Sequence, residues 1–205
     1  MRFEGVLVMH INWQLRELNL KIVYYGPALS GKTTNLEQIY ARVDVVHRSE
    51  LVSLKTHEDR TLFFDFLQLE LGKINNLLPK IHLYTVPGQS YYEASRRLVL
   101  RGADGVVFVA DSAPECANAN LLAWQDMETH LASYNIAMEQ IPIVLQCNKQ
   151  DLYNALSPTQ VGYLLHAGVL PTLPAIANQG NGVFDTLKTI TRNVITQIQH
   201  QTATA

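Results

Sequence analysis

The chain has 205 residues, of which 47% are hydrophobic and 17% charged, and its formal net charge is −2. This length predicts one compact domain with a full core, and the small net charge excludes the basic field that holds nucleic acid regardless of sequence. The two cysteines, Cys116 and Cys147, exclude a disulfide framework, and no apolar run approaches the roughly 20 residues that span a bilayer.

The first half of the chain predicts strands and helices in alternation. "LNLKIVYYG" (18–26) is typical of a buried strand, and "KTTNLEQIYARV" (32–43) has apolar residues at helical spacing. "RTLFFDFLQLELG" (60–72) predicts a longer strand, with "KIHLYTV" (80–86) as its antiparallel neighbour. "EASRRLVLRG" (93–102) predicts a helix.

The second half continues this alternation and predicts the fold class. The predicted strands are "GVVFVADS" (105–112), "IPIVLQCNK" (141–149) and "LPAIA" (173–177), and the predicted helices are 118–134, 157–168 and 182–199. Continuous apolar strands separated by helices indicate an α/β fold. We expect a mostly parallel sheet of six to seven strands, with helices on both faces and one antiparallel pair at an edge.

The two ends of the chain carry no recognisable targeting signal. The start is too weakly apolar for secretion, Arg2 stands where N-myristoylation requires glycine, and "QIQHQTATA" lacks a cysteine for prenylation. We expect a cytoplasmic protein without a direct membrane anchor. Residues 11–200 should form the domain, with 1–10 as an N-terminal extension and 201–205 as a flexible tail.

The segment between the first predicted strand and helix, "GPALSGKTT", matches Gly-x-x-x-x-Gly-Lys-[Ser/Thr]. Such a loop directs successive backbone N–H groups at phosphate oxygens. We assign phosphate binding to Gly26, Pro27, Ala28, Leu29, Ser30, Gly31, Lys32, Thr33 and Thr34. Lys32 is expected to reach the β- and γ-phosphates and Thr33 to ligate Mg²⁺. A plain glycine turn is the disfavoured alternative, since the match arises by chance in roughly one such chain per hundred.

A second motif selects the base. Asn148, Lys149 and Asp151 follow a predicted strand in the pattern Asn-Lys-x-Asp. A carboxylate here accepts hydrogen bonds from the ring N–H and exocyclic amine of guanine, whereas adenine presents neither donor in that arrangement. The motif is weak alone, but downstream of a phosphate loop in one domain it predicts a guanine nucleotide site.

Together these motifs resemble the Ras-like small GTPases. The combination of "YYGP" (24–27) with "TVPGQ" (85–89) is similar to the bacterial cell-polarity GTPases of the MglA family, and the resemblance extends from about residue 11 to 196. It implies a Ras-like G domain that binds GTP or GDP with Mg²⁺ and hydrolyses GTP slowly, as a switch in cell polarity or motility. It also implies effector proteins, a homodimeric Roadblock-family GTPase-activating partner and polar localisation through partners. The family pattern places Met9 nearer the true start than Met1.

The resemblance assigns further roles. Thr61, with Thr56 as a weaker candidate, would contact Mg²⁺, and Arg60 would be a catalytic arginine in cis rather than an exposed strand residue. Gln89 would orient the attacking water, and Lys32 would also act in catalysis. The remaining nucleotide contacts would come from Gly88 near the γ-phosphate and from Ala177 and Asn178 beside the guanine carbonyl.

Two residues depart from expected patterns. Thr85 stands where most Ras-like proteins have an aspartate near Mg²⁺, a replacement shared by the MglA family. Ala28 replaces the glycine usual in that family, and we expect its methyl group to slow hydrolysis. Two alternatives stay open: a nucleotide-locked interaction module with negligible hydrolysis, and a P-loop ATPase or kinase, which Asp151 disfavours.

Overall fold

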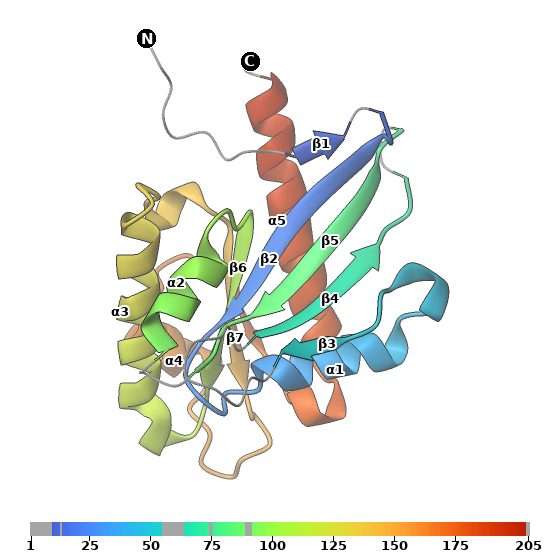
Figure 1. Ribbon diagram of the computed structural model, residues 1–205. Helices are drawn as coiled ribbons and strands as arrows, with labels where there is room; N and C mark the ends of the chain where they lie inside the picture. Colours follow the sequence, from blue (N-terminus) through green and yellow to red (C-terminus); the bar gives the residue numbers. More distant parts are fainter. Residues whose placement is uncertain (1–9, 13, 55–63, 74–75, 89–91, 204–205) are drawn as a thin grey trace.

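The computed structural model describes residues 10–12, 14–54, 64–73, 76–88 and 92–203 (Figure 1). The strands are β1 (His10–Asn12), β2 (Glu17–Tyr25), β3 (Val52–Leu54), β4 (Phe64–Glu70), β5 (Leu78–Thr85), β6 (Gly105–Asp111), β7 (Ile143–Asn148) and β8 (Thr172–Pro174). The helices are α1 (Lys32–Arg42), α2 (Glu93–Leu100), α3 (Ala117–Ala132), α4 (Pro158–Leu164) and α5 (Val183–Ala203).

The strands form one sheet in the order β3-β4-β5-β2-β6-β7-β8. β2 is central and pairs in parallel with β5 and β6, while β4 is antiparallel to β5, as predicted. The mostly parallel α/β sheet is therefore confirmed. Two three-residue strands extend it: β1 pairs antiparallel with β2, and β3 with β4.

These two additions correct the expected strand count. The described sheet has eight strands instead of six to seven, and three antiparallel pairs instead of one. The sequences "HIN" and "VSL" are too short to show a period of two, so no pattern distinguished them from loops.

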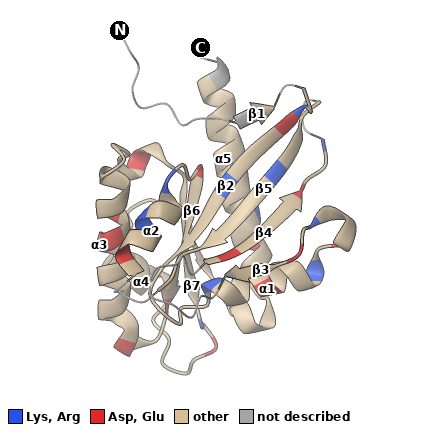
Figure 2. Cartoon of the chain, viewed as in Figure 1, with Lys and Arg blue, Asp and Glu red and all other residues tan. Residues whose placement is uncertain are grey.

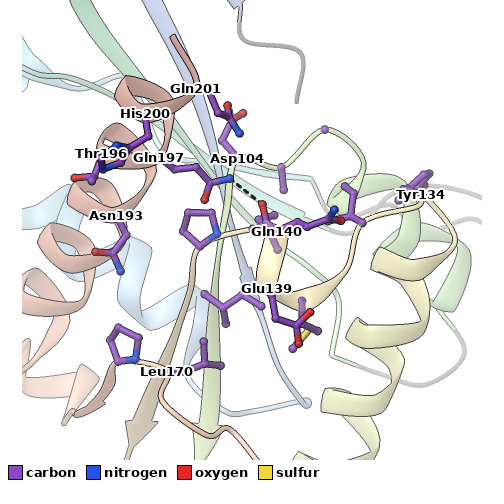
Figure 3. A pocket seen from close by; sticks show the side chains of 18 of the residues that line it. Asp104, Tyr134, Glu139, Gln140, Leu170, Asn193, Thr196, Gln197, His200 and Gln201 are labelled. Atoms are coloured by element: carbon purple, nitrogen blue, oxygen red, sulfur yellow. Dashed lines mark hydrogen bonds between the residues drawn. The ribbon is translucent and has the colours of Figure 1, made fainter. Parts of the chain in front are cut away.

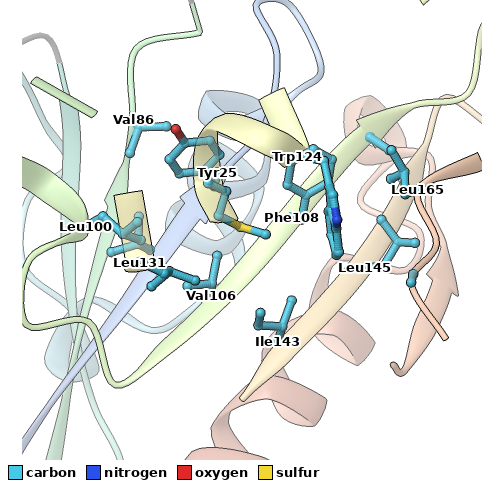
Figure 4. Close-up of a cluster of buried hydrophobic side chains, with 14 of the residues drawn as sticks. Tyr25, Val86, Leu100, Val106, Phe108, Trp124, Leu131, Ile143, Leu145 and Leu165 are labelled. Atoms are coloured by element: carbon cyan, nitrogen blue, oxygen red, sulfur yellow. The ribbon is translucent and has the colours of Figure 1, made fainter. Parts of the chain in front are cut away.

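Helices cover both faces of the sheet (Figure 1). On one face, α2, α3 and α4 enclose an apolar cluster that includes Tyr25, Phe108, Trp124 and Leu145 (Figure 4). On the other face, α1 and α5 enclose a second cluster built on β2, β4 and β5. The two-sided cover explains why β6 and β7 are buried at every position.

Several local features have a clear origin in the sequence. Ser157 caps α4 by accepting a hydrogen bond from the Gln160 N–H, with Pro158 at the first helical position. Cys147 is a fully buried free thiol, and burial raises its pKa to about 12. Cys116 lies in a short turn, half-buried. Within the described ranges no helix is long and apolar enough to cross a membrane.

Candidate nucleotide-binding site

The phosphate loop joins β2 to α1 at the carboxyl end of the central strand, and its glycines are sterically required. Gly26 has φ 139° and Gly31 has φ 102°, both in the left-handed region that favours glycine. A Cβ atom at Gly26 would lie 2.3 Å from the Val109 carbonyl oxygen, and one at Gly31 would lie 2.2 Å from Asn148 Nδ2. The loop therefore packs too closely against β6 and β7 to accept side chains at either position.

Lys32 folds back across this loop. Its ammonium donates hydrogen bonds to the carbonyl oxygens of Gly26 (2.9 Å) and Pro27 (2.6 Å), and the residue is buried. Burial lowers the pKa of Lys32 to about 7, with a further contribution from the charge of Arg96, while Asp65 opposes the shift. A phosphate group would favour the charged lysine, so the site is electrostatically suited to an anion.

A carboxylate that the sequence analysis missed lies at the start of α1. The Thr33 hydroxyl donates to Asp65 Oδ2 at 2.5 Å, and Ser53 donates to Asp65 Oδ1 at 2.6 Å. Thr85 holds Asp65 twice: its hydroxyl donates to Oδ2 (2.9 Å) and accepts from the Asp65 N–H (2.9 Å). The available signal was the alternation of buried and half-buried residues along β4. Asp65 occupies one of the buried positions of this strand, and the other buried positions are leucines.

The base motif is joined directly to the phosphate loop. Asn148 donates from Nδ2 to the Ser30 carbonyl (2.8 Å) and accepts at Oδ1 from the Ala177 N–H (2.8 Å). Lys149, in a left-handed conformation, donates to Asp111 Oδ2 at 2.6 Å. Asp151 is exposed. The phosphate loop, the base motif and the Ala177 loop therefore form one continuous site.

The remaining described residues of the predicted site border these loops. Asn178 is exposed, and its carbonyl accepts a hydrogen bond from Gln38 of α1 at 3.2 Å. Gly88 packs on the phosphate loop, because a Cβ atom there would lie 2.4 Å from both N and Cα of Ala28. Ala28 and Leu29 form the exposed tip of the loop. Thr34 lies in the first turn of α1.

Comparison with known proteins decides the family. Residues 7–194 match the ADP-ribosylation factor (Arf) family. The chain is 48% identical over 189 residues to the mutual gliding-motility protein MglA of Myxococcus xanthus (strain DK1622), covering 92% of this chain and 97% of that protein. The chain belongs to the MglA-like small GTPases.

More distant relatives of this GTPase family match a shorter part of the chain. ADP-ribosylation factor-like protein 4A of Homo sapiens is 27% identical over 149 residues, covering 73% of this chain and 67% of that protein. ADP-ribosylation factor-like protein 2 of Drosophila melanogaster is 25% identical over 163 residues, covering 79% of this chain and 77% of that protein. Membership makes the chain a GTPase that uses GTP, GDP and Mg²⁺, which confirms the predicted fold and enzyme class.

The GTPase residues predicted from resemblance alone are only partly described. Arg60, Thr61, Gln89 and the weaker candidate Thr56 lie outside the described residues. Thr85 is described and buried at the end of β5, where it contacts Asp65. The aspartate absent from position 85 is thus matched by a carboxylate on the adjacent strand.

The residues around Thr33 fit a magnesium ion. Mg²⁺ prefers hydroxyl, carboxylate and phosphate oxygens, and Thr33 and Asp65 place a hydroxyl and a carboxylate oxygen 2.5 Å apart beside the phosphate loop. The described residues, including those around Thr33, contain no cluster of three or more His, Cys, Asp or Glu side chains suited to a metal.

A groove on the described surface lies away from this site. It has a volume of about 1180 Å³ and is lined by the amino ends of β6 and β7, the segment before β8 and the last turns of α5 (Figure 3). Across it, Gln197 of α5 donates to the Gln140 carbonyl at 2.8 Å. Because the phosphate loop follows the carboxyl end of β2, this groove is at the opposite end of the parallel strands.

Proposed function

We propose that the chain is a GTP-dependent switch that holds its nucleotide on residues 26–34, the base motif and the Ala177–Asn178 loop. The observation that carries this proposal is the pair of hydrogen bonds made by Asn148, which connect the phosphate loop to the base-binding loops. Lys32 faces the phosphates, Asp151 accepts from guanine and the Ala177 N–H lies beside the guanine carbonyl.

The Thr33 hydroxyl would hold magnesium, and the Asp65 carboxylate on β4 would support the site. A metal bound with the nucleotide neutralises charge on the β- and γ-phosphates. Asp65 orients the Thr33 hydroxyl and supplies the negative charge that other Ras-like proteins take from the position of Thr85. Thr85 in turn fixes Asp65 by two hydrogen bonds.

Hydrolysis requires the segments on either side of β4 and β5. Thr61 completes the metal site, Gln89 orients the attacking water, and Arg60 neutralises charge that develops on the transferred phosphoryl group. The Gly88 N–H contacts the γ-phosphate. The close approach of Gly88 to Ala28 supports this role, because it places the Gly88 backbone beside the phosphate loop.

The biological setting follows from the MglA relative, whose name describes a gliding-motility protein. We infer a role in motility or cell polarity, exerted through effector proteins and a Roadblock-type homodimer that stimulates hydrolysis. The protein is cytoplasmic and reaches a cell pole through partners. A nucleotide-locked module is the second candidate, favoured by the contact of Ala28 with Gly88.

A nucleotide panel tests the proposed function. The chain should bind GTP and GDP at least about 100-fold more tightly than ATP, because Asp151 finds no donor on adenine. Single-turnover assays should show slow release of phosphate from GTP that requires Mg²⁺. Equal binding of ATP and GTP would contradict the proposal of a GTP-dependent switch. Tight GTP binding without phosphate release would instead favour the nucleotide-locked interaction module.

The magnesium assignment has its own test. Asp65→Asn should raise the Mg²⁺ concentration needed for stable GDP binding about tenfold, since the buried charge is lost. Ser53→Ala, which removes a neighbouring hydrogen bond but no charge, is the matched control. The exchange variant Asp65→Thr/Thr85→Asp should recover most of the Mg²⁺ dependence. Unchanged dependence in Asp65→Asn would assign this carboxylate a purely structural role.

A further inference from the structure

A network of polar side chains crosses the apolar cluster beneath α2 and α3. Tyr25, the last residue of β2, is fully buried, and its hydroxyl lies 3.0 Å from Nδ1 of His130 on α3. Arg96 of α2 donates to Asp126 of α3 at 2.8 Å, and its charge acts on Tyr25. Nε2 of His130 lies 3.8 Å from Glu93 Oε1 at the start of α2. We name these five residues the Tyr25 network.

Burial fixes the direction of the hydrogen bonds. It raises the pKa of Tyr25, so the hydroxyl keeps its proton, and it lowers the pKa of His130, so the ring is neutral at pH 7. Tyr25 therefore donates to Nδ1 of His130. Nε2 carries the remaining ring proton and lies 3.8 Å from Glu93 Oε1, which is too far for a hydrogen bond.

The network joins α2, the helix that follows Gly88, to Tyr25, the residue that precedes the phosphate loop. Tyr25 is adjacent to Gly26, and α2 begins shortly after Gly88. Basic residues lie on α2 and acidic residues on α3 (Figure 2). Deeper in the core, α2 is held by Val99 and Leu100, whose apolar contacts are not directional. The polar contacts are directional, so they fix the orientation of the first turns of α2.

We propose that the Tyr25 network positions α2, and with it Gly88, relative to the phosphate loop, so that Tyr25, Arg96 and His130 are positioning residues for GTP hydrolysis. This proposal rests on the proposed function. None of the three side chains touches a residue assigned to the base. Their loss therefore slows hydrolysis while nucleotide affinity stays nearly unchanged.

The chain provides a matched control in the neighbouring residue. Tyr24 is also fully buried, and burial raises its pKa, but its hydroxyl has no hydrogen-bond partner among the described residues. Tyr24 belongs to the cluster on the α1 and α5 face, whereas Tyr25 belongs to the cluster under α2 and α3. Both substitutions to phenylalanine remove one buried hydroxyl from β2, and only one breaks the network.

The decisive experiment compares Tyr25→Phe with Tyr24→Phe. For Tyr25→Phe we expect GDP and GTP affinities within about threefold of the original protein, a single-turnover hydrolysis rate about tenfold lower and faster amide hydrogen exchange in residues 93–100. Tyr24→Phe should match the original protein in all three measurements. Hydrolysis that is unchanged in Tyr25→Phe, or equally reduced in both variants, would overturn the proposal.

A second pair of variants tests the proposal if Tyr25→Phe does not fold. His130→Asn keeps an acceptor near the position of Nδ1 and should restore most of the rate that His130→Leu loses; equal loss in both would reject the network. Hydrogen exchange is measured without nucleotide, so it tests the positioning of α2 independently. If the original protein fails to bind GTP while exchange in α2 still depends on Tyr25, the proposed function fails and the network stands.

Discussion

The two halves of the sheet are built differently. β6 and β7 are parallel, covered by helices on both faces and buried at every residue. β4 and β5 are antiparallel and alternate buried with half-buried residues. The base motif follows the first pair, whereas the residues expected around the γ-phosphate flank the second. The strands that lead to the base motif are thus enclosed on both faces, and the strands beside the residues expected near the γ-phosphate have one half-buried face.

The difference has an energetic basis. A strand buried on both faces cannot shift without opening packed volume, while a strand with one exposed face gives up fewer contacts when it moves. Asp65 and Thr85 are buried polar residues in the β4–β5 half, and they contact each other and the start of α1. The more open half is therefore connected to the start of α1 by this polar contact in addition to the apolar contacts of the second cluster.

The largest expected effect concerns stability. Leu145→Ala in β7 should lower the free energy of unfolding by about 2–5 kcal/mol, because the fully buried leucine leaves a cavity. The same change at half-buried Leu78 in β5 should cost about 1 kcal/mol. Urea denaturation measures both values. Equal costs for the two leucines would remove the energetic distinction between the halves.

The next effect separates base recognition from chemistry. Asp151→Asn should weaken GDP and GTP binding by about 100-fold or more, since a charged acceptor for two guanine donors is lost. Xanthosine nucleotides, which carry a carbonyl in place of the amine, should regain affinity through the Asn amide. Filter-binding assays measure these affinities, and hydrolysis of the bound nucleotide should be unaffected. A fall in that rate would mean that the two halves are not functionally separate.

The smallest effect concerns the tip of the phosphate loop. Ala28→Gly should raise the single-turnover rate of GTP hydrolysis roughly three- to tenfold by removing the methyl group from the residue whose backbone Gly88 approaches. Leu29→Gly is the matched control, because Leu29 has φ 61°, which glycine accepts, and its side chain is 88% exposed. Equal rates for Ala28→Gly and the original protein would show that Ala28 does not restrain hydrolysis.

The sequence was most informative where chemistry is local. The phosphate loop was predictable because Gly26 and Gly31 meet steric demands set within a few residues, and α4 because its cap is encoded by Ser157 and Pro158. Asp65 was missed because its partners Thr33 and Thr85 lie on other elements. The β4–β5 register, with Phe66 opposite Tyr84, brings Asp65 next to Thr85.

The Tyr25 network was equally invisible in the sequence. Tyr25 and His130 are 105 positions apart, and the "YYGP" stretch that contains Tyr25 indicates a family but no partner for its hydroxyl. A buried tyrosine at the end of an apolar strand predicts packing, as the adjacent Tyr24 illustrates. Only the docking of α3 on the sheet distinguishes the two hydroxyl groups.

The two hydrogen bonds of Asn148 have a consequence for ligand fragments. Because Asn148 connects the carbonyl of Ser30 to the N–H of Ala177, ordering of the base loops also orders the phosphate loop. A nucleoside and a pyrophosphate added separately should each bind weakly, because the binding of either fragment includes the free-energy cost of ordering both loops. For the intact nucleotide this free-energy cost arises only once. Its affinity should therefore exceed the product of the two fragment affinities, and Asn148→Ala should reduce this chelate advantage.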